Sequence, residues 1–485
     1  MDKSTDTETY LRKGHALYRQ KKYKPALYCF DKAILIDPNS KRAYAYRGLT
    51  LNCQKQKKLA LTAFEHAIQL DSKYSKAYLE KGRTLIALKK YQKALEALQK
   101  AIELNPGDSE SYYLKASILV SLQNKNAALY SYDKAIQVNP HFRKAYRGKA
   151  DILLSLNKFE ESILLYEVAL QLKPTDANAY QCKGKALVGL KKFDEAIELF
   201  EQVIQLCPNC FESHYEKATA LQAIGDNLAA VEAFDRGLQL SPNSYKCYEN
   251  KGKALQALVM YEEAIETYNQ ALQLNPNSFY IHYNKAIILQ AMGDYTAAIQ
   301  FYDKTIQLDP HSYQSYETKG KILQMLGRYE EALEAYDNVI RLSPICKDSS
   351  EDAFYQKGQI LYTLGRYQEA LEHYENRIWD MANDVRAHVG RGITLAAMSK
   401  HEEAIEALEK GIQLDVGCFA AYLSKGNVLS TLGRLEASLE AYEKALEIDP
   451  SSVEALNGKK SVLDELKKHN ILKLEVHERP ASCSS

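Results

Sequence analysis

The sequence lacks a long hydrophobic run, an excess of one charge and a regular cysteine framework. No apolar stretch of the 485-residue chain approaches the roughly 18 residues that cross a bilayer, and the first twenty residues contain no signal-peptide core. The 63 Lys and Arg residues balance 62 Asp and Glu residues, which disfavours binding to nucleic acid or to an anionic membrane. Nine irregularly spaced cysteines favour free thiols in a reducing compartment. We therefore expect a cytoplasmic protein with no membrane insertion and no nucleic-acid partner.

The sequence also lacks the motifs of common enzyme classes. It contains no GxxxxGK[ST] phosphate loop and no GxSxG nucleophile turn, and the Gly-Arg-Gly segment 390–392 has no third glycine. The segment 401–405 lacks the second histidine of a zinc peptidase. Cys207, Cys210 and His214 could ligate a metal, but the second cysteine pair of a zinc site is missing. We expect no catalytic residue, no cofactor and no metal; stoichiometric zinc uptake would support the alternative.

What the sequence does contain is a repeat of 34 residues. Ten consecutive rows run from residue 7 to residue 346, and three further rows cover 351–452. In every row, position 4 is aromatic or His, position 8 is Gly or Ala, and position 11 is Leu. Position 20 is Ala or Ser, position 24 is Phe, Tyr or Leu, and position 32 is Pro in ten rows. The repeat occupies nearly the whole chain, so no room remains for a separate catalytic domain.

The spacing within each row predicts two helices. Positions 4, 8 and 11 fall on one face of a first helix, and positions 20 and 24 share a face of a second. The small residue at position 8 lets the helices approach closely, and the proline at position 32 ends the second helix. A single hairpin cannot bury both of its faces, so its stability must come from stacking against neighbouring hairpins.

These residues resemble the signature of the tetratricopeptide repeat family. The resemblance implies an all-α fold in which antiparallel helix pairs stack into a right-handed superhelical solenoid, with the first helices lining a concave groove. One departure is systematic, because position 7 is Lys or Arg in all thirteen rows where the family usually has Leu. We interpret these side chains as stems that lie over the hairpin with their charges in water. The alternative is a basic ladder that binds an acidic partner.

The repeat register divides the chain into five segments. The insertion between the two blocks of repeats would lengthen one connection and act as a local bend or hinge, and the last regular segment would cap the exposed end of the array. The segments are 7–346 with ten repeats, 347–350 with the insertion, 351–452 with three repeats, 453–469 with a capping helix, and 470–485 with a flexible tail.

Rows seven to ten contain the strongest candidate for a binding site. By family resemblance, positions 2, 5, 6, 9 and 12 of each first helix face the groove. In these rows they include tyrosines, amides and Glu–Lys pairs, and tyrosine rings beside amides suit an extended peptide whose backbone is recognised by hydrogen bonds. Alternatively, the Glu–Lys pairs support only their own helices. The candidate groove residues are Tyr215, Gln222, Glu249, Asn250, Lys253, Gln256, Tyr283, Asn284, Gln290, Glu317, Lys321 and Gln324.

Two family-specific binding modes match the sequence poorly. Asn250 and Asn284 are similar to two rungs of the asparagine ladder in the O-linked N-acetylglucosamine transferases, whose catalytic domain is absent here. The carboxylate clamp of heat-shock co-chaperones requires Lys and Asn at positions where the nearest row has Arg147, Asp151 and Cys182. We therefore do not expect the groove to capture the terminal carboxylate of a chaperone.

Row eleven departs from the pattern at its end. Arg377 replaces the usual Ala, Ala382 replaces Pro, and Trp379 is the only tryptophan of the chain. We favour a packed contact between repeats for Trp379; the alternative is that it anchors a partner at the hinge.

Together these features predict a non-catalytic scaffold or adaptor that binds an extended peptide, or a helix of a protein partner, in the groove. The second hypothesis is a regulatory or targeting subunit, for example a bacterial effector, that recruits an enzyme or chaperone to a substrate.

Overall fold

The computed structural model describes residues 3–342 and 347–477, and for residues 3–5, 347–350 and 469–477 it describes the helical backbone alone. These described residues form 27 α-helices and no β-strand, which confirms the predicted all-α fold. The chain divides into two compact units. Unit 1 ends at Leu274 and unit 2 begins at Asn275, and each is considered by itself.

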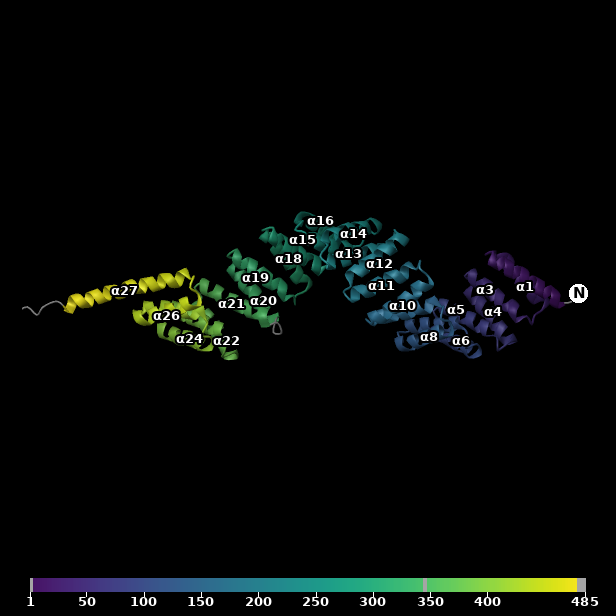
Figure 1. Cartoon of the computed structure of the whole chain (residues 1–485), viewed down its shortest axis with the longest axis horizontal. Helices are drawn as coiled ribbons and strands as arrows, with labels where there is room; N and C mark the ends of the chain where they lie inside the picture. The colour runs from purple at the N-terminus through teal and green to yellow at the C-terminus, as the bar shows by residue number, and fades with distance from the viewer. Residues whose placement is uncertain (1–2, 343–346, 478–485) are drawn as a thin grey trace, which may run out of the picture. The chain divides into compact units, whose positions relative to one another are not determined.

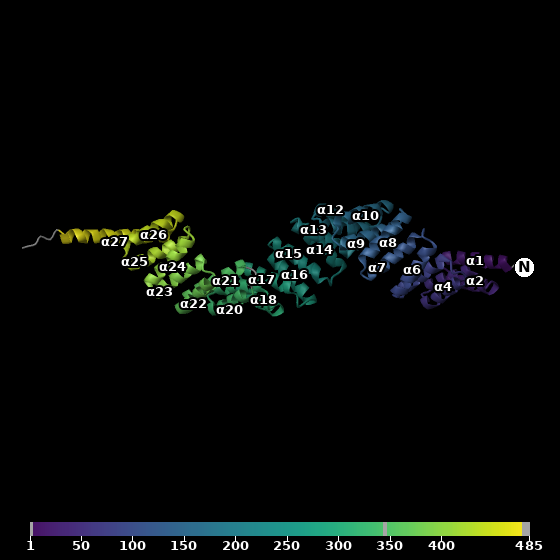
Figure 2. The same cartoon turned by 90° about the horizontal axis from the view of Figure 1, so that it is seen from below.

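Unit 1 contains sixteen helices, in which odd-numbered helices are the first and even-numbered helices the second of each row. Each helix packs against the next in chain order, as Figures 1 and 2 show for the purple to teal part of the chain. The helices are α1 (Lys3–Arg19), α2 (Tyr23–Ile36), α3 (Lys41–Cys53), α4 (Lys57–Leu70), α5 (Ser75–Ala87), α6 (Tyr91–Leu104), α7 (Ser109–Ser121), α8 (Lys125–Val138), α9 (Arg143–Ser155), α10 (Phe159–Leu172), α11 (Ala177–Gly189), α12 (Phe193–Leu206), α13 (Phe211–Ala223), α14 (Asn227–Leu240), α15 (Tyr245–Ala257) and α16 (Tyr261–Leu274).

Unit 2 continues the same alternation, and among its described residues no second helix follows α27. Its helices are α17 (Phe279–Ala291), α18 (Tyr295–Leu308), α19 (Tyr313–Met325), α20 (Tyr329–Leu342), α21 (Lys347–Thr363), α22 (Tyr367–Asp380), α23 (Val385–Ala397), α24 (His401–Leu414), α25 (Phe419–Thr431), α26 (Leu435–Ile448) and α27 (Val453–His477).

In seven rows the glycine at position 8 lies against the aromatic ring at position 24 of the same row. A Cβ atom added to Gly48 would stand 2.6 Å from the Phe64 ring, and one added to Gly252 would stand 2.5 Å from the Tyr268 ring. Both rings are completely buried. The close approach of the two helices in a row is thus confirmed, and it depends on the missing side chain.

The turn inside each row contains a left-handed residue. Glycine supplies it at five places, including Gly225 and Gly327, but at eight others a residue with a side chain adopts the same positive φ. Val259 is the least suited of these, because its φ is 62° and its side chain is branched at Cβ.

Position 7 explains how neighbouring rows are held in register. Ten of the thirteen bases, and Lys459 of the terminal helix, pair with an acidic residue at position 25 of the preceding row, so our interpretation of charges left in water is wrong for these rows. A basic ladder for an acidic partner is disfavoured too, because most of these bases are already paired. The ion pairs are Arg47–Asp31, Lys81–Glu65, Lys149–Asp133, Lys183–Glu167, Lys217–Glu201 and Lys251–Asp235 in unit 1, and Lys319–Asp303, Lys357–Asp337, Arg391–Glu375, Lys425–Glu409 and Lys459–Glu443 in unit 2.

Two segments between and after the repeats are more helical than expected. Residues 347–350 do not lengthen a connection but form the first turn of α21, in keeping with an Asp-Ser-Ser sequence that suits a helix N-terminus. Whether they act as a hinge stays a prediction. The final helix α27 extends to His477 instead of ending at residue 469, because the sequence holds no proline between residue 453 and Pro480. Residues 478–485 of the expected tail lie outside the described residues.

Candidate functional site

The candidate groove residues are divided between the two units. In unit 1, Tyr215 and Asn250 contact each other, because the Asn250 side-chain amide donates a 2.9 Å hydrogen bond to the Tyr215 hydroxyl. The Gln222 amide donates to the backbone carbonyl of Asn250 at 3.4 Å. Burial raises the pKa of Tyr215, so the phenol stays protonated. These three side chains join the neighbouring first helices α13 and α15.

The Glu–Lys pairs of the candidate groove form within their own helices. Glu249 accepts from Lys253 at 2.7 Å in α15, and Glu317 accepts from Lys321 at 2.5 Å in α19. Both pairs span one helical turn. This agrees with the alternative that the Glu–Lys pairs support their own helices. Their charges are therefore partly neutralised before any ligand arrives.

The glutamines at position 12 have a structural partner that sequence reasoning missed. In three rows, the side-chain oxygen of the glutamine accepts a hydrogen bond from the tyrosine at position 24, twelve residues later. The tyrosine thus fixes which end of the amide is the oxygen, and the amide nitrogen can donate to another group. The bonds join Tyr268 to Gln256 at 3.4 Å in unit 1, and Tyr302 to Gln290 at 3.1 Å and Tyr336 to Gln324 at 2.9 Å in unit 2.

In unit 2 one of these hydrogen-bonded glutamines, Gln324, lines a cleft between the first helices α19 and α21. Tyr336, whose pKa is raised by burial, donates to Gln324, and the Gln324 amide nitrogen donates in turn to the Gln356 side-chain oxygen at 2.9 Å. This relay orients the amides of both glutamines. The cleft has a volume of about 810 Å³, and we call it the amide cleft. It is lined by Lys321, Gln324, Met325, Tyr329, Gln356, Gln359, Ile360, Tyr362 and Thr363.

Two candidates of row nine occupy a neighbouring part of unit 2. The Tyr283 ring stacks on Phe279 at 5.8 Å and meets the Tyr302 ring edge-on at 5.8 Å. Asn284 follows it in α17 and is half-buried. The stacked rings fix the orientation of Tyr283, which lowers the entropy that a bound ligand would have to remove.

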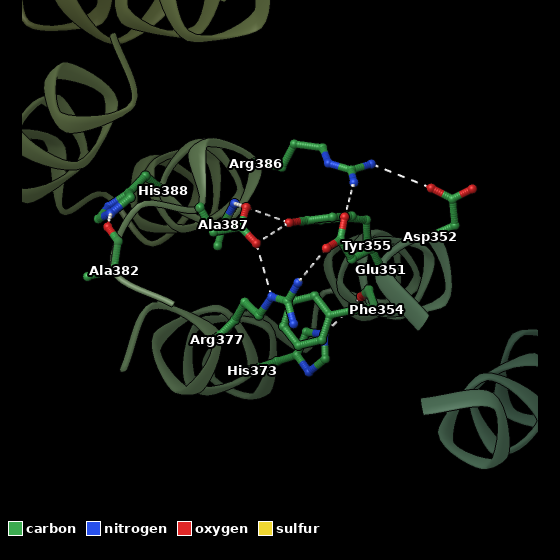
Figure 3. Close-up of polar contacts among 11 residues, drawn as sticks. Glu351, Asp352, Phe354, Tyr355, His373, Arg377, Ala382, Arg386, Ala387 and His388 are labelled. Carbon is green, nitrogen blue, oxygen red and sulfur yellow. Dashed lines mark hydrogen bonds and ion pairs between the residues drawn. The ribbon is translucent and has the colours of Figure 1, made fainter. Parts of the chain in front are cut away.

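The irregular end of row eleven is tied together by a charged network instead of the usual Ala and Pro packing (Figure 3). Asp384 accepts hydrogen bonds from the Tyr355 hydroxyl at 2.5 and 2.6 Å, from Arg377 at 3.0 Å and from the backbone N–H of Ala387 at 3.1 Å. Burial opposes ionisation, but the bonds from Tyr355 and Arg377 hold the pKa of Asp384 below its usual value.

Two arginines extend this network to the start of α21. Arg377 pairs with Glu351 at 3.4 Å, and Arg386 reaches Glu351 at 3.3 Å and Asp352 at 3.5 Å (Figure 3). The Arg386 guanidinium also lies 4.0 Å from the centre of the Tyr355 ring. The irregular end of row eleven is therefore a set of linked ion pairs that connects α21, α22 and α23.

Trp379 does not make the packed contact that we favoured. Its side chain is 90% exposed on α22, so that prediction is wrong and the partner-anchor alternative stays open. A signal in the sequence could have shown this. Trp379 occupies position 29, which is Gln, Glu or Arg in every other row except the first, and the first row has the exposed Leu35 there.

The residues considered as metal ligands or as parts of a carboxylate clamp form hydrogen bonds with neighbouring groups of the protein. Cys210 accepts from the Ser213 hydroxyl at 3.1 Å, and the His214 ring nitrogen bonds to the carbonyl of Pro208 at 3.2 Å. No group of three His, Cys, Asp or Glu residues in the described part of the chain is placed to hold a metal ion. Asp151 accepts from the Tyr166 hydroxyl at 2.7 Å. None of the helices within residues 3–342 and 347–477 is long and apolar enough to span a membrane.

Family models of the tetratricopeptide repeat match the chain over more than half of its length. One such model matches residues 7–40, 75–108, 279–312 and 419–452, and another matches 109–142, 211–244 and 385–415. Further models of the same repeat match 177–210, 301–334 and 318–378, and a TPR repeat model matches 150–191 and 260–293. None of the curated proteins compared shows significant sequence similarity to this chain.

Several solved structures are similar in fold at low sequence identity. The APC/C hetero-tetramer Cut9-Hcn1 is 16% identical, with a TM-score of 0.39 over 96% of this chain and 99% of that one. The TPR protein YrrB, described as having an unusual peptide-binding site, is 21% identical, with a TM-score of 0.34 over 38% of this chain and 95% of that one. PilF of Pseudomonas aeruginosa is 19% identical, with a TM-score of 0.42 over 45% of this chain and 100% of that one.

Proposed function

Because the chain belongs to the tetratricopeptide repeat family, we propose that it is a non-catalytic, cytoplasmic scaffold that holds an extended segment of a protein partner against its first helices. The seven described free cysteines support a reducing location. The observation that carries the proposal is the amide cleft of unit 2, in which hydrogen bonds inside the protein orient two glutamine side chains before a ligand arrives.

The chemistry of the amide cleft suits a peptide backbone. An extended peptide presents a carbonyl and an N–H at every residue, and a primary amide can both donate and accept. The Tyr336–Gln324–Gln356 relay fixes which end of each amide is available, so little side-chain entropy is lost on binding. Backbone recognition of this kind tolerates different ligand sequences.

Apolar side chains beside these amides supply contact area for the ligand's side chains. Met325 is 66% exposed and Tyr362 is 36% exposed, and both line the cleft. Met adapts to different shapes, while Tyr adds a rigid ring with a polar end. A ligand with one apolar side chain between hydrogen-bonded backbone groups fits this arrangement.

A peptide-display selection on the purified full chain tests the proposal. Random linear peptides are selected on the wild type and then compared on the double variant Gln356→Ala/Tyr362→Ala. We expect selected peptides to lose binding to this variant while its helicity and unfolding midpoint stay unchanged. Peptides that bind both proteins equally, or a selection that enriches none, would contradict a peptide site in the amide cleft.

The second candidate function is a regulatory or targeting subunit that recruits an enzyme or chaperone, and the exposure of Trp379 favours it. Proximity labelling in cells with Trp379→Ala and with the amide-cleft variant separates the two roles. A partner lost only with Trp379→Ala supports recruitment through row eleven. A partner lost only with the amide-cleft variant supports the peptide scaffold.

A further inference from the structure

A second cleft of unit 2 lies between the second helices α20 and α22. Its volume is about 540 Å³, and the buried side chains of Leu333 and Leu361 form part of its lining. It differs from the amide cleft in its helices and in its chemistry, because most of its charged side chains are acidic. We call it the acidic cleft.

The charges of the acidic cleft are only partly balanced. Five carboxylates line it, but only two cationic side chains, Lys357 and Arg366, do. Three of the carboxylates already hold these two cations in ion pairs of 2.5 to 3.0 Å. The other two, Glu334 of α20 and Glu372 of α22, make no ion pair with any described residue. They leave uncompensated negative charge on both walls of the cleft.

Trp379 belongs to α22, the helix that forms one wall of this cleft, although its own side chain is 90% exposed. Glu372, Asn376 and Trp379 are spaced by four and three residues on α22, so they share one face of the helix. Side chains of a helix lean toward its N-terminus, which directs the indole over the turn that contains Asn376, itself a lining residue of the cleft. The exposed ring and the Glu372 carboxylate, which accepts a hydrogen bond from Gln368 but makes no ion pair, therefore lie on the same face of α22.

The combination of these groups selects one kind of ligand chemistry. An exposed tryptophan attracts Lys and Arg side chains through its π face, and it is the residue type that most often dominates the energy of an interface. Unpaired carboxylates attract the same cations and repel acidic peptides and phosphate groups. Position 29 is polar in nearly every other row, so Trp379 is not explained by the packing of the repeat.

We propose that Trp379 and the acidic cleft form a docking surface for a Lys- and Arg-rich segment of a protein partner. The basic side chains enter the cleft between Glu334 and Glu372, and one of them stacks on the indole. This surface is separate from the amide cleft, so the proposal does not depend on a peptide binding there.

Collisional quenching of the wild-type protein tests the charge at the indole, because Trp379 is the only tryptophan and reports on this place alone. Relative to their quenching of free N-acetyltryptophanamide, we expect caesium to quench its fluorescence more strongly than iodide. In Glu334→Lys/Glu372→Lys the order should reverse. The matched control Glu436→Lys/Glu440→Lys makes the same charge change on exposed positions of α26 and should keep the wild-type order. Stronger quenching by iodide in the wild type, on the same relative scale, would overturn the proposal.

Binding of a fluorescent octa-arginine peptide tests the docking itself. We expect the peptide to shift the emission of Trp379 and to bind roughly fivefold more weakly to Trp379→Ala, the loss of one exposed cation–π contact. Affinity should also fall with rising salt. Tyr130→Ala, which removes an aromatic ring of 64% exposure from unit 1, is the control and should bind as the wild type does.

Further variants distinguish docking at this surface from general attraction between opposite charges. Equal weakening by Glu334→Lys/Glu372→Lys and by Glu436→Lys/Glu440→Lys would show non-specific attraction and refute the site. Unchanged affinity in Trp379→Ala, or an emission shift produced by octa-glutamate instead, would refute it as well. The amide-cleft variant Gln356→Ala/Tyr362→Ala should bind octa-arginine normally, so failure of the proposed function leaves this test intact.

Discussion

Lys251 of α15 pairs with Asp235 of α14, the second helix of the preceding row, across 2.6 Å. The two residues are sixteen positions apart, and the same spacing recurs at most other rows. Because each pair joins the first helix of one row to the second helix of the row before it, the pairs act between hairpins and not within them. The side chain of Lys251 is 20% exposed, so its charge is only partly screened by water.

A double-mutant cycle measures what one such pair contributes. We expect Lys251→Ala and Asp235→Ala to show a coupling free energy of about 0.2 to 1 kcal/mol in urea unfolding, because the pair is at the surface. The coupling should shrink in 1 M salt. A coupling of zero at low salt would show that the pairs do not hold neighbouring rows together.

Filling the space beneath a position 24 ring should destabilise unit 1. A Cβ atom at Gly252 would stand 2.5 Å from the Tyr268 ring, so Gly252→Leu should cost roughly 1 to 3 kcal/mol in the free energy of unfolding. Gly107→Ala is the control, since its Cβ would meet only Asn105, at 3.5 Å. Equal unfolding midpoints for the two variants would mean that position 8 does not set the distance between the helices.

Replacing the valine that has a left-handed backbone conformation should stabilise the protein. Val259 has a φ of 62° and is 64% exposed, so Val259→Gly removes backbone strain without removing a packed side chain. We expect a gain of about 1 kcal/mol from thermal or urea unfolding. The reverse change at an equivalent turn, Gly327→Val, should lower stability, since Gly327 has a φ of 71°.

His373 should make unit 2 sensitive to mild acid. Burial lowers the pKa of His373 to about 4, and its ring stacks on Phe354 at 3.7 Å. The unfolded chain binds the proton near pH 6.5, so it binds more protons than the folded chain between pH 6.5 and 4. Stability should therefore fall as the pH falls through this window, by up to about 3 kcal/mol.

The histidine prediction is tested by unfolding at a series of pH values. His373→Phe keeps a ring against Phe354 and should flatten the dependence between pH 6.5 and 4. His311→Phe, at an exposed position, should leave it unchanged. A slope that survives in His373→Phe would place the titrating group elsewhere.

The helices could be predicted from the sequence because the same spacing of small, aromatic and leucine residues recurs in all thirteen rows. The small residue at position 8 and the aromatic residue at position 24 predicted the close helix packing that Gly252 and Tyr268 show. The ion pair of Lys251 with Asp235 was missed because it crosses from one row to the next, and a pattern examined within single rows does not show it. Comparing each position 7 with the residue sixteen places earlier would have found it.

The candidate site was harder to predict, because it depends on which partner each polar group has. Gln324 was singled out as a groove residue, but only the structure shows that its oxygen is held by Tyr336 and its nitrogen by Gln356. Tyr215 and Asn250 likewise contact each other, which residue type alone does not show. Trp379 was misjudged because size and hydrophobicity suggested burial, whereas its position in the repeat indicated solvent.

The terminal helix α27 keeps the contact that joins one row to the next. Lys459 of α27 bonds to Glu443 of α26 at 3.0 Å, the same pairing that position 7 makes elsewhere, although no second helix follows α27 among the described residues. The cap thus contacts row thirteen as any ordinary successor would. A genetic splice that adds or deletes one whole 34-residue module ahead of residue 453 would leave this junction unchanged, so the array's length can vary without redesigning its terminus.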